Sequence, residues 1–342
     1  MRQFQKGFSL VELMVASTIG LIVVGSIGYF YLGTRQAYRT TDNLSRIQES
    51  QRIALDTLAR EIRLAGYAGC VNLSARPPRV IANPPTGSPS PYVVNGNTVA
   101  QIYDNATGWT NPTVIPRVTA GATDVLSIRY ASNTGQPARL TGNLTATNAN
   151  IQMSGNPGNF NANDILIISD CGSTDVFRAT NVSNGGTVTI AHAMSANTDN
   201  RLAKNYGPDS EVLAFHDVTF FIGTNPTTNN TALYRFDVGV TGAVAEEIAE
   251  NVENMQLQYG LDTTGSGAVN SYATTVPAGA RVVAIRMALV FKGAGVGNAD
   301  TGLNTATSAQ TYILLNTSYP APDTRLRKVG TATVLLRNQA LF

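Results

Sequence analysis

The chain has 342 residues and a formal net charge of +2, with 24 Lys and Arg against 22 Asp and Glu. Charged residues make up 13% of it, about half the ~25% of an ordinary soluble domain, whereas 43% of residues are hydrophobic. This balance excludes global disorder and a general electrostatic field for nucleic acid, so no nucleic-acid partner is expected. With two Cys and two His, the chain lacks the ligands for a zinc ribbon, a four-Cys iron–sulfur site or a His-rich metal centre. No cofactor is expected.

The chain opens with a short basic segment followed by a long apolar run. Arg2 and Lys6 precede an apolar stretch from Phe8 to Leu32, in which Glu12 is the one charged residue. As a helix this stretch would be roughly 37 Å long, which exceeds the ~30 Å hydrocarbon core of a bilayer. Basic residues before a span favour the cytoplasmic side. The segment therefore predicts one membrane span with its C-terminal side outside.

An ordinary cleaved secretory signal fits this segment poorly. The apolar run is longer than the usual 7–15-residue core of a signal peptide, and no small-residue cleavage site follows it. A carboxylate inside the span, such as Glu12, costs about 2.5–3.5 kcal/mol at the membrane centre on insertion scales. Glu12 is therefore a functional candidate that requires a partner.

The stretch from Lys6 to Ala16, KGFSLVELMVA, resembles the class III signal of type IV prepilins. The resemblance implies that a prepilin peptidase cleaves between Gly7 and Phe8, that the new Phe8 amine is methylated, and that the apolar helix is retained. It also implies that Glu12 pairs with the Phe8 amine of a neighbouring subunit. Such a pair would neutralise both groups and set the axial register between subunits.

Beyond the apolar run, the pattern of one long helix continues. Charges of both signs alternate, and apolar residues recur at spacings of three or four at Leu44, Ile47, Ala54, Leu55, Leu58, Ile62 and Ala65. The pattern predicts a helix from Phe8 to about Ala65, roughly 87 Å long, that ends at Gly66 and Gly69.

The rest of the chain reads as a β-rich region. Residues 74–122 are loop-rich with short strands, and Trp109 is expected to cover part of the core. Strands are expected at residues 125–130, 164–169, 175–181, 187–191, 212–222, 232–238, 255–262, 281–292 and 325–337. A long helix followed by antiparallel strands predicts an α+β fold with the helix packed on a sheet.

Several later segments are similar to PilW-type minor pilins: residues 60–70, 253–262, 281–290 and 325–338. The resemblance implies a pilin fold with large loop insertions. It divides the chain into a leader (1–7), a transmembrane and filament-core helix (8–34), the amphipathic second half of that helix (35–66) and a β-rich globular domain (67–342). Residues 74–210 carry no recognisable motif. The J-type pseudopilin of type II secretion is a close relative in design and remains an alternative.

Outside this resemblance, few residues carry chemical signals. If the β-domain lies in the periplasm, Cys70 and Cys171 are expected to form a disulfide, although two buried free thiols are the alternative. The stretch from Asp262 to Gly267 partly resembles a calcium loop, but the alternating acidic residues and the closing Glu are absent. His192 and His216 stand alone, and His216 lies within an expected strand. Structural roles are therefore expected for both, and no catalytic residue is assigned.

These features predict a minor pilin without enzymatic activity. Before assembly such a protein would reside in the inner membrane, with its N-terminus in the cytoplasm and its β-domain in the periplasm. It would then be incorporated into the extracellular pilus. Its expected partners are prepilin peptidase, the inner-membrane assembly platform, other minor pilins, the major pilin and a tip adhesin. Its expected task is to prime pilus assembly and cap the fibre, with consequences for twitching motility and adhesion. A membrane-anchored secreted binding protein or hydrolase is the alternative from a different class.

Overall fold

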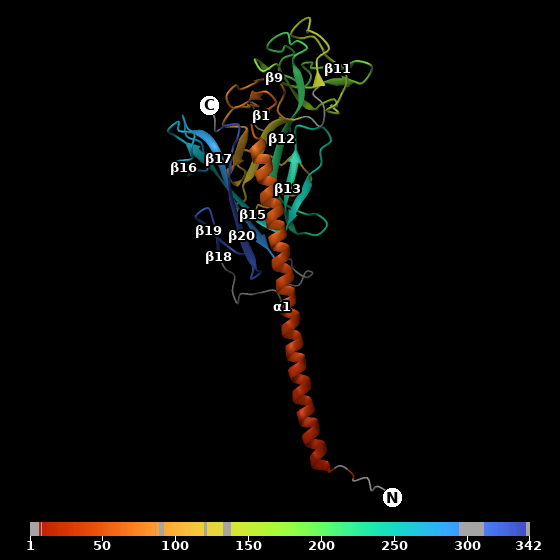
Figure 1. Ribbon diagram of the computed structural model, residues 1–342, viewed down its shortest axis with the longest axis vertical. Coiled ribbons are helices and arrows are strands. Elements are labelled where there is room, and N and C mark those ends of the chain that lie inside the picture. The colour runs from red at the N-terminus through yellow and green to blue at the C-terminus, as the bar shows by residue number, and fades with distance from the viewer. Residues whose placement is uncertain are drawn as a thin grey trace.

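A single long helix carries a β-rich domain on its C-terminal half (Figure 1). The computed structural model describes residues 7, 9–85, 87–88, 92–119, 122–132, 138–293 and 311–339. Helix α1 spans Leu10–Leu64, 55 residues, and its N-terminal half protrudes from the rest of the molecule. The expected α+β fold, with a long N-terminal helix and large insertions, is confirmed.

Helix α1 is bounded by sequence signals at both ends. Ser9 is the N-cap, so the helix begins at Leu10 rather than at Phe8, which lies outside the described residues. At the other end the chain leaves the helix after Leu64, and Gly66 adopts a φ of +76°, a left-handed conformation that glycine tolerates. The buried face consists of Asn43, Ile47, Ala54, Leu58, Glu61 and Ile62. The apolar stripe was predicted, whereas the buried Asn43 and Glu61 were not.

The larger sheet has eleven strands in the described residues, and its central order is β2-β1-β5-β12-β8-β9-β3. Two strands form its centre: β12 (Glu211–Thr224) pairs antiparallel with β5 (Val125–Ser132) along almost all of β5. Flanking strands are β1 (Tyr67–Ala68), β2 (Val71–Asn72), β3 (Arg79–Val80), β4 (Ala100–Tyr103), β6 (Ala138–Arg139), β8 (Ile165–Ser169), β9 (Thr174–Arg178), β13 (Thr231–Asp237) and β14 (Glu246–Glu250).

A second sheet is formed by the C-terminal part of the chain, in the order β16-β15-β17-β20. Its strands are β15 (Val252–Asp262), β16 (Ser271–Ala273), β17 (Arg281–Lys292) and β20 (Arg327–Leu335). On β17 the expected alternation is replaced by nearly continuous burial. Met287 and Leu289 join the main core with α1, while Ala288 and Val290 are covered by the hairpin of β18 (Thr311–Leu314) and β19 (Thr317–Pro320).

Residues 138–212, which carry no sequence motif, build a second hydrophobic core at the end of the molecule farthest from the N-terminus (Figure 1). A small sheet of β7 (Ile151–Met153), β10 (Asn181–Ser183) and β11 (Val188–Ala191) packs on this core. Strands β8 and β9 of the main sheet contribute side chains to it as well. Phe160, Phe177 and Tyr206 are its largest fully buried side chains. This part of the chain is therefore a folded distal unit.

The loop-rich segment at residues 74–122 contains β3, β4 and the 3-10 helix η1 (Asp104–Ala106). Trp109 packs on Phe221 of β12 with ring centroids 5.4 Å apart, so it covers part of the core as expected. Helix α1 contacts β5, β14, β17 and β20, and thereby lies across both sheets.

Candidate functional site

The first turn of α1 is closed by a reciprocal pair of hydrogen bonds between Ser9 and Glu12. The Glu12 backbone N–H donates to Ser9 Oγ at 3.2 Å, and the Ser9 N–H donates to Glu12 Oε2 at 3.0 Å. This capping box satisfies two N–H groups that would otherwise be free at the helix start. Gly7 lies just before it, and a Cβ there would meet no atom within 4 Å. Phe8, the predicted site of cleavage and methylation, lies outside the described residues.

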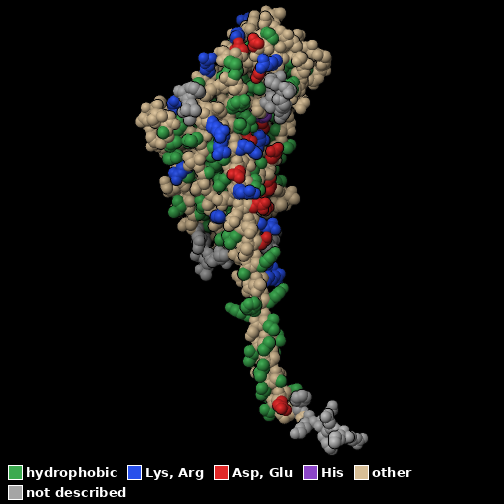
Figure 2. Space-filling view, in the orientation of Figure 1, with side chains coloured by type: hydrophobic (Ala, Val, Ile, Leu, Met, Phe, Trp, Pro, Cys, Tyr) green, Lys and Arg blue, Asp and Glu red, His purple; other side chains and the backbone are tan. Residues whose placement is uncertain are grey.

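Within the described residues, the N-terminal half of α1 is not buried by the rest of the protein. Its large hydrophobic side chains from Leu10 to Tyr38 are all exposed, and Figure 2 shows them along the protruding rod. By length and composition this helix can cross a membrane. The hydroxyls of Ser17, Thr18 and Ser26 donate to carbonyls one turn earlier, at 2.8 Å each. Internal satisfaction of polar groups is what a lipid environment requires.

A disulfide joins the chain just beyond the helix to the distal unit. Cys70 and Cys171 are bonded with an S–S distance of 2.07 Å and a Cα–Cα distance of 5.4 Å. Cys171 lies in the turn between β8 and β9, where Asp170 accepts from the N–H groups of Gly172 and Ser173. The expected pairing is therefore present, and it encloses a long loop.

Asp262 organises a turn rather than an array of carboxylates. Its two oxygens accept from the backbone N–H groups of Thr264, Gly265, Ser266 and Gly267, at 2.7–3.2 Å. These donors, led by the Gly267 N–H, lower the pKa of Asp262 to about 2. No group of three metal-ligating side chains occurs in the part of the chain that the structure describes. The resemblance to a calcium loop thus corresponds to a backbone turn closed by one aspartate.

The two histidines occupy different environments. His192 is buried in the distal unit, with Nε2 3.0 Å from the Ala149 carbonyl oxygen and its ring against Phe177. His216 lies in β12, where Nδ1 is 2.6 Å from Asp237 Oδ2 and Nε2 is 3.0 Å from Ser132 Oγ.

His216 therefore links a serine and an aspartate from two neighbouring strands. Asp237 Oδ1 accepts from the backbone N–H groups of Asp217 and Gly239, at 3.2 and 3.0 Å. Those bonds hold the carboxylate beside His216 Nδ1, while Nε2 lies within hydrogen-bond distance of the Ser132 hydroxyl. The connectivity is that of a serine hydrolase triad, which is defined by geometry rather than chain order. Sequence reasoning did not find it because register alone brings the three residues together.

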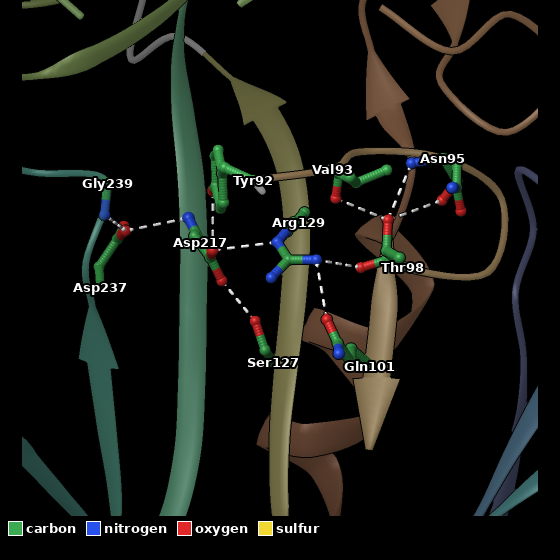
Figure 3. A network of polar contacts seen from close by, with 10 residues as sticks. All are labelled: Tyr92, Val93, Asn95, Thr98, Gln101, Ser127, Arg129, Asp217, Asp237 and Gly239. Carbon is green, nitrogen blue, oxygen red and sulfur yellow. Dashed lines mark hydrogen bonds and ion pairs between the residues drawn. The ribbon is translucent and has the colours of Figure 1, made fainter. Parts of the chain in front are cut away.

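On the opposite face of β12 a buried ion pair forms the centre of a polar network (Figure 3). Arg129 Nε is 3.0 Å from Asp217 Oδ2, and both side chains are 1% exposed. The hydroxyls of Tyr92 and Ser127 also donate to Asp217, and Arg129 donates to the Thr98 carbonyl at 2.8 Å.

The network keeps its charges inside the protein because each is compensated. Burial opposes the charge of Arg129, but the adjacent Asp217 carboxylate outweighs it and raises the guanidinium pKa. Burial likewise raises the pKa of Tyr92. The signal available in the sequence was the presence of Arg129 and Asp217 in the middle of apolar strands.

These features fit a pilin-like protein with a membrane anchor: a long apolar helix with a carboxylate in its first turn, laid across antiparallel sheets. Residues 2–28 match the family model of the prokaryotic N-terminal methylation motif, and residues 219–338 match that of type IV pilus-assembly protein W. The matches support assignment of the chain as a type IV pilus minor pilin of the PilW type. Both families are structural components of pili rather than enzymes. No curated protein and no solved structure matches the chain.

Proposed function

We propose that this minor pilin takes part in priming assembly of a type IV pilus and in capping it, within a complex of minor pilins. The observation that carries the proposal is the apolar half of α1, whose large hydrophobic side chains are exposed from Leu10 to Tyr38 in the single chain. An apolar surface of this size requires lipid before assembly and neighbouring helices afterwards. The folded distal unit at residues 138–212 is an addition that a bulk filament subunit does not need.

The proposal assigns three roles to the N-terminal segment. Prepilin peptidase cleaves between Gly7 and Phe8 at the cytoplasmic face, the Phe8 amine is methylated, and the Glu12 carboxylate receives the amine of a neighbouring subunit. In the single chain Glu12 already accepts from the Ser9 N–H. When a neighbouring subunit docks, its amine forms a charge-assisted hydrogen bond with Glu12, which replaces or joins the local bond from Ser9. This stronger bond favours a fixed register between subunits.

Mass spectrometry of the N-terminus tests the first two roles. The expected result is a mature chain that begins with singly methylated Phe8. A chain that retains Met1, or one cleaved beyond Leu32, contradicts the proposal.

A pair of variants tests the role of Glu12. Glu12→Ala removes both the carboxylate and its cap, whereas Ser9→Ala removes the Ser9 hydroxyl acceptor and keeps the carboxylate. We expect few or no pili and lost twitching with Glu12→Ala, and near-normal fibre number with Ser9→Ala. Normal piliation in the Glu12→Ala strain would refute the registry role.

Localisation and partners follow from the same proposal. Before assembly the chain would reside in the inner membrane with its β-domain in the periplasm, where it would bind the assembly platform. It would then leave the membrane together with other minor pilins, the major pilin and a tip adhesin. The match of residues 219–338 to the type IV pilus-assembly protein W family favours a pilus over a type II pseudopilus.

Hydrolysis is a second candidate function, and the Ser132–His216–Asp237 chain is the observation that favours it. In an ester hydrolysis, Ser132 Oγ would attack the acyl carbonyl while His216 Nε2 takes the hydroxyl proton and passes it to the leaving alcohol. Water would then release the acid and restore Ser132. A fluorophosphonate probe tests this candidate: labelling of Ser132 that is lost in His216→Ala supports it, and an unlabelled wild-type chain refutes it.

A further inference from the structure

A cavity of about 440 Å³ lies where the distal unit meets the flank of the larger sheet. It is bounded by the end of β9, by the chain that follows β3, and by the segment that follows β13; Figure 1 places β9 toward the distal end and β13 along the flank. Its lining includes Asn83, Pro84, Pro112, Arg178 and Phe236. Its volume falls within the roughly 300–1,000 Å³ range of small-molecule sites.

Strand alternation shows that the cavity lies on the side of the sheet away from α1. Arg235 points toward the helix, because its Nε is 3.4 Å from Glu61 Oε1 of α1. Successive side chains on a strand face opposite sides, so the next residue, Phe236, points away from the helix. Packing of α1 against neighbouring helices would therefore leave this cavity open to solvent.

Among the described residues that line the cavity, Arg178 is the one with a charged side chain. It donates from Nη1 to the Asn163 carbonyl at 2.7 Å and from Nη2 to the Asn83 carbonyl at 3.4 Å. In the described part of the chain no carboxylate forms an ion pair with it. A half-buried cation whose direct hydrogen bonds go to neutral carbonyls, with Asp164 acting only as a nearby charge, carries a desolvation cost that a bound anion would offset.

A comparison of the pKa shifts of the buried arginines supports an anion site at Arg178. Carboxylate partners raise the pKa of Arg129, Arg235 and Arg327 in spite of burial. Burial lowers the pKa of Arg178. The nearby Asp164 carboxylate offsets this effect of burial only in part, so of these four arginines Arg178 is the one whose charge the protein compensates least.

The walls of the cavity complement the cation. Pro84, Pro112 and Phe236 present half-exposed ring surfaces, and no hydrogen bond of the Asn83 side-chain amide occurs within the described residues. A guanidinium recognises a carboxylate through paired N–H donors. The ring surfaces can pack against the C–H face of a compact ring, and the amide can form hydrogen bonds with hydroxyls.

We propose that this cavity binds a sugar acid, a carboxylate-bearing monosaccharide unit, with Arg178 on the carboxylate. The inference does not depend on a position at the pilus tip.

Calorimetry on the full-length chain in detergent tests the proposal with D-glucuronate as probe. Neutral D-glucose tests the need for the carboxylate, and inorganic phosphate tests whether charge alone suffices. We expect binding of glucuronate only, and at least tenfold weaker binding by Arg178→Gln. The matched control is Arg201→Gln, which removes the same charge from an exposed side chain and should bind like wild type.

Asn83→Asp provides a second variant that leaves Arg178 in place. It puts a carboxylate beside the guanidinium, so it should remove glucuronate binding while the chain stays folded by circular dichroism. Three results would each overturn the proposal: no binding of glucuronate by wild type, equal binding by Arg178→Gln or Asn83→Asp, or phosphate binding as tight as that of glucuronate.

Discussion

Asp124 is a buried carboxylate whose energetic role depends on pH. It lies just before β5 and accepts from the backbone N–H groups of Asn105 and Leu257, at 2.9 and 2.8 Å. Because Leu257 belongs to β15, this side chain links the two sheets. Burial outweighs these bonds and raises the pKa of Asp124 to about 6.

The pH dependence of unfolding should therefore carry a contribution from Asp124. A raised pKa means that the folded state binds the proton more tightly, so this contribution is full below about pH 4 and is lost as the pH rises to about 6. Replacement by Asn removes the titration. Between pH 4 and pH 7 the stability of Asp124→Asn should rise by about 2–3 kcal/mol relative to wild type. Urea unfolding in detergent at pH 4 and pH 7 measures the free energy of unfolding of both proteins. An equal change in this free energy for wild type and Asp124→Asn would contradict the prediction.

The Arg129–Asp217 pair should behave differently from a surface ion pair. Both partners are buried, so Arg129→Met leaves the Asp217 carboxylate uncompensated and should lower the free energy of unfolding by about 3–5 kcal/mol. The matched control is Arg46→Met, which breaks the exposed Arg46–Asp42 pair and should cost at most about 1 kcal/mol. Denaturant titration distinguishes the two, and equal costs would show that the network is not a buried charge cluster.

At the scale of elements, α1 is one continuous helix with two different environments. Its N-terminal half is exposed and apolar, whereas its C-terminal half buries a stripe against β5, β14, β17 and β20. Gly330 of β20 allows a close approach, since a Cβ there would lie 2.8 Å from Gln51 Cγ of the helix. The Glu61–Arg235 pair adds a polar tie between α1 and β13.

Packing rather than helix propensity should determine the stability of this interface. Leu58 is fully buried, so Leu58→Ala should lower the free energy of unfolding by about 2–5 kcal/mol. Ile53 is 40% exposed on the same helix, and Ile53→Ala should cost clearly less. Thermal unfolding of the two variants provides the comparison. Similar losses would indicate that the helix is held by its own turns and not by the sheets.

At the scale of the whole molecule, the disulfide joins the end of the helix to the distal unit. Cys70 and Cys171 are 101 residues apart. Crosslinking a loop of this length restricts the unfolded chain by up to about 4–5 kcal/mol in the entropy model. The bond also holds the β8–β9 turn next to the chain that leaves α1.

A double variant, Cys70→Ser with Cys171→Ser, should lower the free energy of unfolding by about 2–5 kcal/mol. Each single variant should migrate differently from wild type on non-reducing gels and identically to it on reducing gels. Identical mobility on both gels, or unchanged stability of the double variant, would show that the disulfide does not form.

Local patterns in the sequence predicted α1 and the long strands, whereas most short strands, such as β14 and β16, were not predicted individually. The apolar run, the three-to-four spacing up to Ala65 and the Gly residues behind it indicate α1. Alternation and apolar runs determine the long strands, which lie close to their expected positions. These features depend on neighbours along the chain, so they can be read without a fold.

Tertiary structure decided the contacts between distant residues. Register between β5 and β12 places Arg129 opposite Asp217 on one face and brings His216 next to Ser132 on the other. The cavity at Arg178 depends on three segments far apart in the chain. A one-residue shift in register would exchange the two faces of a strand. The sequence by itself therefore determined α1, the long strands and the resemblance to pilins, while the buried charges and the candidate sites were decided by how the strands pair and pack.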